Sequence, residues 1–113
     1  MDHFYPMDGR KYYIDLEKVS GNLFQRFKEF DKEVFQQESA LPRKYKELIA
    51  IALAHTTQCP YCIETHVKNA YKAGASDEEI AEAIFIAAAI RAGGAIAHST
   101  IAMATLKKCH ERS

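Results

Sequence analysis

The sequence predicts an all-α fold, and three observations support this prediction. Beyond roughly the first dozen residues, apolar residues recur at intervals of three and four, and no stretch alternates with period two. Proline stands at predicted helix starts, and glycine follows a predicted helix end. The chain of 113 residues has the length of one domain, so we expect a single compact helical domain over residues 1–113. A chain this short would bury more apolar surface by associating with copies of itself.

The first predicted helical segment carries one apolar stripe. The stripe is formed by Leu16, Val19, Leu23, Phe27, Phe30 and Val34, and it is widened by Phe24 and Phe35. Charged residues at positions 28, 29, 31 and 32 lie on the opposite face, as in an amphipathic helix. The Ser20-Gly21-Asn22 step weakens this helix, so an alternative prediction is that the helix begins only after that step. We expect the stripe to belong to the core.

The next two predicted helices meet at a short turn. Pro42 suits the first position of a helix that ends near residues 56–58. The apolar stripe of that helix consists of Tyr45, Leu48, Ile49, Ala52 and Leu53. Pro60 then opens the following helix, with Cys59 at or next to its N-cap. Gly74 suits a left-handed C-cap at the end of this helix.

The last predicted helix starts at Ser76 and Glu79, which have capping-box spacing. From position 80 to position 103 it is nearly all alanine, isoleucine and glycine, a small-residue surface that lets other backbones approach closely. We expect this segment to be buried by its own chain, by another subunit or by both. We also expect Gly93-Gly94 to break or kink it into two helices.

Charge and hydropathy exclude several classes of partner. The formal net charge is zero and the sequence pI is about 7, so no nucleic acid or anionic membrane is expected to bind. The N-terminus lacks the layout of a signal peptide, and Arg91, Gly93, Gly94 and His98 interrupt the long apolar run, which argues against a membrane span. We therefore expect a cytoplasmic protein. In that reducing compartment a Cys-x-x-Cys pair is more often catalytic or metal-binding than structural.

The stretch HTTQCPYCIETH carries the candidate chemistry. Cys59, Cys62 and His66 are spaced three and four residues apart, so they project from one face of a helix. Cysteines in the first turn feel the positive end of the helix dipole, which favours the nucleophilic thiolate. His66, one turn beyond Cys62, can accept its proton. If this helix and the preceding one form an antiparallel pair, Glu47 faces His66 and can hold its imidazole in the required tautomer.

Three interpretations of the cysteine pair compete. CPYC is also a glutaredoxin-type sequence, but there it follows a β-strand, whereas here the preceding residues have helical periodicity. A zinc site would use Cys59, Cys62, His66 and either His55 or Glu47, although no second pair of ligands stands at finger-like spacing. The third interpretation is thiol redox chemistry. A non-catalytic module, stabilised by zinc or acting as a redox sensor, is the alternative to an enzyme.

The offsets of Glu47, Cys59, Cys62 and His66 resemble the signature of alkylhydroperoxidase D, within the carboxymuconolactone decarboxylase superfamily. The resemblance covers roughly residues 41–103 and includes RAGGAIAH on the small-residue helix. It implies a compact all-α unit that assembles as a homotrimer or homohexamer. It also implies a thiol-dependent peroxidase that reduces a peroxide, is re-reduced by a dithiol electron donor, and needs no cofactor or metal. The decarboxylase branch fits less well, because its members typically lack the cysteine pair.

The resemblance also implies roles for individual residues. Glu47 and His66 would form a proton relay, while one cysteine attacks the peroxide and the other resolves the sulfenic acid as a disulfide. We assign the attack to Cys62, which is one turn from His66, although the helix dipole favours Cys59 as much. Tyr61 departs from the pattern, because peroxidases of this family often carry histidine there. A phenol is a poor base near neutral pH, so the relay would be simpler and the activity weaker.

Two further residues are secondary candidates for a role near the cysteines. His55 lies four residues before Cys59, close enough for a supporting contact, but a histidine that interacts with the dipole at a helix C-terminus explains it as well. Cys109, in a polar tail, is expected to be a spectator thiol.

Overall fold

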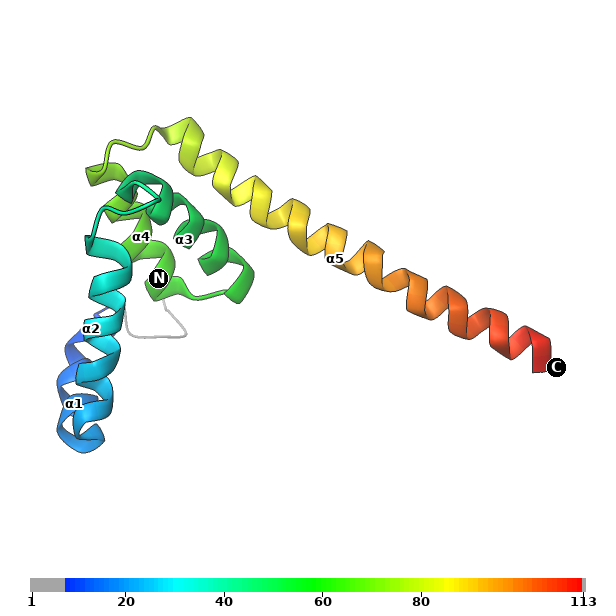
Figure 1. The fold of residues 1–113 in the computed structure, drawn as a ribbon, viewed down its shortest axis with the longest axis horizontal. Helices are drawn as coiled ribbons and strands as arrows, with labels where there is room; N and C mark the ends of the chain where they lie inside the picture. Colours follow the sequence, from blue (N-terminus) through cyan, green and yellow to red (C-terminus); the bar gives the residue numbers. More distant parts are fainter. Residues whose placement is uncertain (1–7, 113) are drawn as a thin grey trace. The chain divides into compact units, whose positions relative to one another are not determined.

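The computed structural model describes residues 8–112, which contain helices and no strands (Figure 1). The elements in chain order are the 3-10 helix η1 (Gly9–Tyr12), α1 (Tyr13–Ser20), α2 (Asn22–Gln36), α3 (Arg43–Thr57), α4 (Pro60–Lys72) and α5 (Asp77–Arg112). The all-α prediction is confirmed for these residues. The chain divides into two compact units, Met1–Ser39 and Ala40–Ser113, which we describe separately. The single domain over residues 1–113 stays a prediction.

The first unit holds α1 and α2, which are separated by Gly21. This glycine has φ 60° and ψ −127°, a backbone conformation that residues with a Cβ rarely adopt. It ends α1 and precedes the first residue of α2, so the weak step predicted at Ser20-Gly21-Asn22 is a helix boundary. The second of the two helices begins at Asn22, the last residue of that step.

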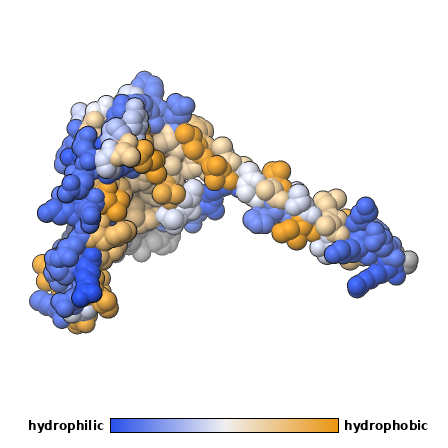
Figure 2. All heavy atoms as spheres, in the orientation of Figure 1, coloured by the Kyte–Doolittle hydropathy of each residue, from blue (hydrophilic) through white to orange (hydrophobic). Residues whose placement is uncertain are grey.

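The apolar stripe of this unit is mostly exposed. Phe24 is buried, and its ring centroid lies 5.2 Å from that of Tyr13. Leu23 and Phe30, by contrast, are 75% and 65% exposed. The prediction that the stripe belongs to the core is therefore wrong for this structure, because a pair of short helices can bury only the side chains between them. Figure 2 shows apolar and polar residues side by side on these helices.

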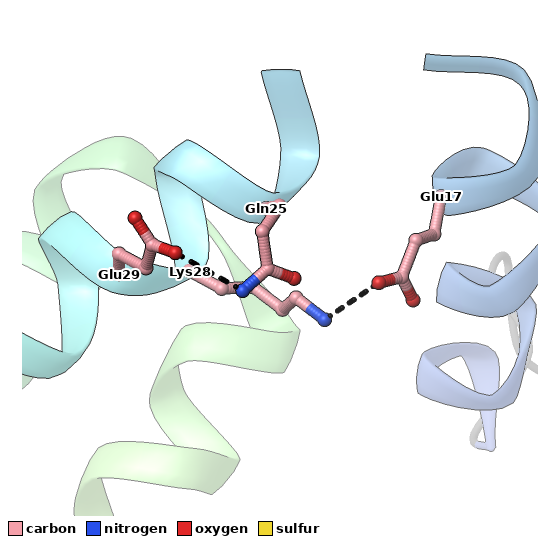
Figure 3. Close-up of polar contacts among 4 residues, drawn as sticks. All are labelled: Glu17, Gln25, Lys28 and Glu29. Atoms are coloured by element: carbon pink, nitrogen blue, oxygen red, sulfur yellow. Dashed lines mark hydrogen bonds and ion pairs between the residues drawn. The ribbon is translucent and has the colours of Figure 1, made fainter. Parts of the chain in front are cut away.

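Two polar contacts lie on the surface of the first unit, one between its helices and one within α2 (Figure 3). Lys28 of α2 forms an ion pair with Glu17 of α1, with 3.0 Å between Nζ and Oε1. Gln25 donates a hydrogen bond to Glu29 one turn further along α2. Both contacts are solvent-exposed, and exposed pairs of this kind add little to stability.

The second unit is built on a hairpin of α3 and α4. The turn between them is two residues long, and Glu47 near the start of α3 contacts His66 in the middle of α4, so the helices are antiparallel. Pro42 is the N-cap of α3, so the helix begins at Arg43, one residue later than predicted. Gly74 follows the end of α4 with φ 91°, which confirms the predicted left-handed position.

A small core joins α3, α4 and the first half of α5. It consists of Ile51, Ala70, Ala75 and Ala83, with Leu48, Val67, Ile80 and Ile84 packed against it. The predicted stripe of α3 is therefore only partly core. Ile49 and Leu53 are 47% and 57% exposed and line an open apolar groove of about 410 Å³ between α3 and α5. The positions buried in α3 are Glu47, Ala50, Ile51 and Ala54.

Helix α5 begins at the predicted capping box. The backbone N–H of Ser76 donates to the Glu79 carboxylate at 2.9 Å, and the Glu79 N–H donates to the Ser76 hydroxyl at 3.0 Å. The predicted break at Gly93-Gly94 is wrong, because α5 continues through both residues. Glycine lowers helix stability by only about 1 kcal/mol relative to alanine, and a continuous helix of 36 residues tolerates that cost.

The C-terminal part of α5 is solvent-exposed in the single chain. Every residue from position 88 to position 112 is exposed, including Ile90, Ile96 and Ile101 at 67%, 72% and 64%. Figure 2 shows apolar residues continuing along this helix until its polar end. By length and composition alone, α5 also qualifies as a candidate membrane span. Burial of this segment by its own chain is thus limited to the first half, where Ala83 and Ala87 lie.

Candidate active site

The turn between α3 and α4 places both cysteines. Gln58, the residue after α3, is in the left-handed conformation with φ 57° and ψ 49°. Its N–H and that of Cys59 both donate to the carbonyl of Ala54, which closes the end of α3. Cys59 is then the N-cap of α4, and Pro60 occupies the first helical position, where its missing N–H costs nothing. The local sequence therefore reverses the chain direction within two residues and starts a new helix with a cysteine as its N-cap.

The two cysteines form a disulfide in this structure. Cys59 and Cys62 have their Cα atoms 5.3 Å apart, and both residues are half-buried. The N–H of Cys62 donates to Sγ of Cys59 at 3.3 Å, so the cysteine sulfur caps the helix as a serine hydroxyl would. In the reduced protein the same N–H is placed to stabilise a Cys59 thiolate.

The buried carboxylate of Glu47 contacts His66, the histidine on the same face of α4 as the cysteines. Nδ1 of His66 is 2.6 Å from Oε2 of Glu47. Within residues 8–112, Glu47 is the one charged side chain that is buried, with 1% of its surface exposed. A carboxylate this deep requires a partner, because burying an unpaired charge is strongly unfavourable. The Glu47–His66 contact bridges the hairpin between α3 and α4.

The side chains of Glu47, Cys59, Cys62 and His66 have the groups needed for proton transfer and for nucleophilic attack by sulfur. In the tautomer whose Nδ1–H donates to Glu47, the lone pair of the His66 imidazole is on Nε2. His66 is four residues after Cys62 on α4, so the two lie on one helix face. The arrangement is a thiol, a base and a group that orients the base, which is the general pattern of an activated nucleophile.

The two secondary candidates, Tyr61 and His55, lie on the two helices that flank the turn. Tyr61 is half-buried in the first turn of α4, where its carbonyl accepts a hydrogen bond from the Thr65 hydroxyl at 2.9 Å. His55 is half-buried near the end of α3, and its Nδ1 lies 2.8 Å from the carbonyl of Ile51. The Ile51 carbonyl lies within α3, so the helix-end role expected for His55 stays a prediction. Cys109 is an exposed free thiol in the last turns of α5.

The site contains one contact that the sequence did not indicate. Nη1 of Arg91, on α5, donates to the carbonyl of Thr56 at 2.9 Å. The two residues are 35 positions apart, so no local pattern reveals the contact, and the only signal was a lone cation in an apolar run. Within residues 8–112 no three His, Cys, Asp or Glu side chains are grouped closely enough to hold a metal ion.

The chain resembles known proteins over most of its length. The model of the carboxymuconolactone decarboxylase family matches residues 21–105. A protein of Paracoccus denitrificans named uncharacterized protein 4 in cox locus is 46% identical over 92 residues, which cover 81% of this chain and 82% of that protein.

Solved structures resemble the chain as well. A protein from Methanobacterium thermoautotrophicum has a TM-score of 0.68 and 34% identity over 76% of this chain and 94% of its own. A carboxymuconolactone decarboxylase family protein from Legionella pneumophila has a TM-score of 0.67 and 32% identity over 74% of this chain and 73% of its own. A protein from Thermotoga maritima has a TM-score of 0.60 and 35% identity, covering 84% and 87%. The chain therefore belongs to the carboxymuconolactone decarboxylase family, the superfamily to which the resemblance to alkylhydroperoxidase D had pointed.

Proposed function

We propose that the protein is a thiol-dependent peroxidase, or disulfide reductase, that cycles Cys59 and Cys62 between dithiol and disulfide. The observation that carries the proposal is the buried Glu47–His66 pair on the helix hairpin that bears the cysteines. A structural disulfide alone has no use for a base oriented by a buried carboxylate. Perturbed or buried ionisable groups beside a nucleophile are typical of active sites.

In the oxidative half of the proposed cycle, Cys62 attacks a hydroperoxide. His66 takes the thiol proton through Nε2, and the thiolate then attacks the terminal peroxide oxygen. An S–O bond forms and the O–O bond breaks, which oxidises Cys62 to sulfenic acid by two electrons. The leaving alkoxide takes the proton back from the imidazolium and departs as an alcohol. Glu47 stabilises that imidazolium while it exists.

Cys59 completes the cycle. Its thiolate, stabilised at the N-cap of α4, attacks the sulfenic sulfur, so that an S–S bond forms and water leaves with the second thiol proton. An external dithiol then reduces the disulfide by exchange and is itself oxidised. The net reaction converts one hydroperoxide and one dithiol into an alcohol, water and a disulfide. The cytoplasm, where such donors are kept reduced, is the compartment that this cycle requires.

Steady-state turnover of t-butyl hydroperoxide with dithiothreitol tests the proposal. We expect wild type to consume peroxide catalytically, whereas Cys59→Ser and Cys62→Ser each abolish turnover. Cys109→Ser removes an exposed thiol far from the pair in sequence and is the matched control with unchanged turnover. Oxidation of the pair without catalytic turnover would favour the redox-sensing alternative. Stoichiometric zinc in the purified protein, with unfolding on chelation, would favour the zinc-stabilised alternative.

We also propose that the chain assembles with copies of itself, as a homotrimer or homohexamer, through α3 and α5. The exposed apolar side chains of α5 are continuous with the groove that Leu53 and Ile90 line. A soluble monomer rarely exposes so large an apolar patch. Arg91 and His98 in the middle of α5 favour a protein surface over a bilayer as the cover.

A further inference from the structure

Cys59 lies between two helix ends of opposite polarity. It is the N-cap of α4, whose positive end favours a thiolate. It also follows the last residue of α3 by two positions, and the C-terminal carbonyls of a helix form a negative end. That negative end disfavours the same thiolate. The net effect on the thiol depends on what offsets the carbonyls of α3.

The last carbonyls of α3 have several partners. The Ala54 carbonyl accepts the backbone N–H groups of Gln58 and Cys59. The Thr56 carbonyl, three residues before Cys59, accepts a hydrogen bond from Arg91 at 2.9 Å. Arg91 therefore brings a permanent positive charge from α5 to the negative end of α3. Cations at this position stabilise a helix end and reduce its negative potential.

We propose that Arg91 is a positioning residue for the dithiol: it holds the end of α3 and offsets its negative end, which favours the Cys59 thiolate. The inference deepens the proposed function, but it concerns the redox equilibrium of the pair and does not require peroxide turnover. Since a stabilised thiolate favours the reduced protein, Arg91 raises the midpoint potential of the disulfide. Reduction adds two electrons and breaks the S–S bond. With Arg91 present, a smaller fraction of the reduced Cys59 is protonated.

Other ionisable groups near the turn are unchanged when Arg91 is altered. On the last three turns of α3 they are Glu47 and His55, and on the first two turns of α4 they are Tyr61, Glu64 and His66, besides the cysteines themselves. On α5, Glu79 and Glu82 line the same groove as Thr56. Their effects on the thiols are common to wild type and an Arg91 variant. The difference between the two proteins therefore isolates Arg91.

The test measures the midpoint potential of the Cys59–Cys62 couple in mixtures of reduced and oxidised dithiothreitol from pH 6 to pH 9. Arg91→Gln removes the charge and keeps a donor, and Arg91→Lys keeps the charge. Lys107→Gln, an exposed cation further along α5, is the control for loss of one charge. We expect R91Q to change the equilibrium constant about two- to fivefold in favour of the disulfide, or about 10–20 mV towards more negative potential. R91K and K107Q should stay close to wild type.

The pH profile separates electrostatic positioning from a merely structural role. At pH values where Cys59 is protonated in both proteins, Arg91 has no thiolate to stabilise, so the difference between wild type and R91Q should vanish at low pH. A potential in R91Q equal to that of wild type at every pH would overturn the proposal, even if the melting temperature fell. Equal shifts in R91K and R91Q would also overturn it, since charge would then not be the cause. Arg91→Met, which keeps an unbranched stem, replaces R91Q if that variant does not fold, with the same expected shift.

Discussion

Nδ1 of His66 on α4 lies 2.6 Å from the buried carboxylate of Glu47 on α3. The two residues are 19 positions apart, and only the antiparallel packing of the helices brings them together. Because Glu47 is 1% exposed, its charge is separated from water and depends on this partner. The proposed chemistry depends on this contact, because a carboxylate that accepts Nδ1–H leaves Nε2 of His66 as the base.

Glu47→Gln should slow oxidation of the reduced protein by peroxide. The amide oxygen can still accept the His66 proton, but it no longer stabilises an imidazolium, so we expect a loss on the order of 10²-fold. Stopped-flow measurement of the rate with t-butyl hydroperoxide checks this. Glu78→Gln removes an exposed carboxylate in the first turn of α5 and should leave the rate unchanged. Equal rates in E47Q and wild type would remove Glu47 from the mechanism.

Gln58→Gly should stabilise the fold slightly. Gln58 has φ 57°, a conformation that glycine adopts freely and other residues adopt at a cost. We expect the free energy of unfolding in urea to rise by up to about 1 kcal/mol, after allowance for the greater freedom of glycine in the unfolded chain. Gln58→Val, with a β-branched side chain, should lower it. A destabilised Q58G would show that the glutamine side chain makes a contact worth more than the backbone cost.

The start of α5 should weaken in acid. The Ser76 backbone N–H, and after it Lys44, holds the pKa of the Glu79 carboxyl below its ordinary value of 4.5. A group whose pKa is lower in the folded state stabilises it above the unfolded-state pKa, and this contribution is lost as the pH falls through the folded-state pKa. Urea unfolding of wild type should therefore show a loss of stability below about pH 5 that is smaller in Glu79→Gln. Parallel pH curves for the two proteins would contradict this.

Charges on the exposed part of α5 should disrupt assembly. Ile96→Glu and Ile101→Glu place a carboxylate on the apolar surface that we propose to be covered by another copy. Light scattering after size exclusion should show the variants shifting from oligomer to monomer. Tyr71→Glu, an equally exposed position on α4, should not alter the mass. A wild-type protein found in the membrane fraction, with I96E released from it, would instead assign α5 to a bilayer.

Local features of the fold were predictable from the sequence. The Ser76–Glu79 capping box and the start of α4 at Pro60, with Cys59 as its N-cap, depend only on neighbouring residues, and both were predicted. Gly93-Gly94 misled the prediction, because the low helix propensity of glycine is a weak preference that a long helix overrides. The stripe of α3 was also only partly core, since periodicity identifies an apolar face and does not say what covers it.

Long-range features of the site were less accessible. The spacing of Cys59, Cys62 and His66 on one helix follows from local geometry. Glu47 could be named as their partner only by assuming that the two helices are antiparallel, and the resemblance to a known family then included the same residue. The Arg91–Thr56 contact joins elements 35 residues apart through a backbone carbonyl, which leaves no mark on the sequence. Such contacts can be found only once the helices are placed.

Titration of the reduced, metal-free protein with t-butyl hydroperoxide tests the dithiol cycle of Cys59 and Cys62 directly. Remaining thiols are then blocked by alkylation, and the state of each cysteine is mapped by mass spectrometry. We expect one equivalent of peroxide to yield a Cys59–Cys62 disulfide rapidly, with Cys109 alkylated, and a dithiol to restore the starting protein for further rounds. Slow oxidation spread over all three cysteines, or accumulation of sulfinic acid in place of the disulfide, would contradict the proposed dithiol peroxidase.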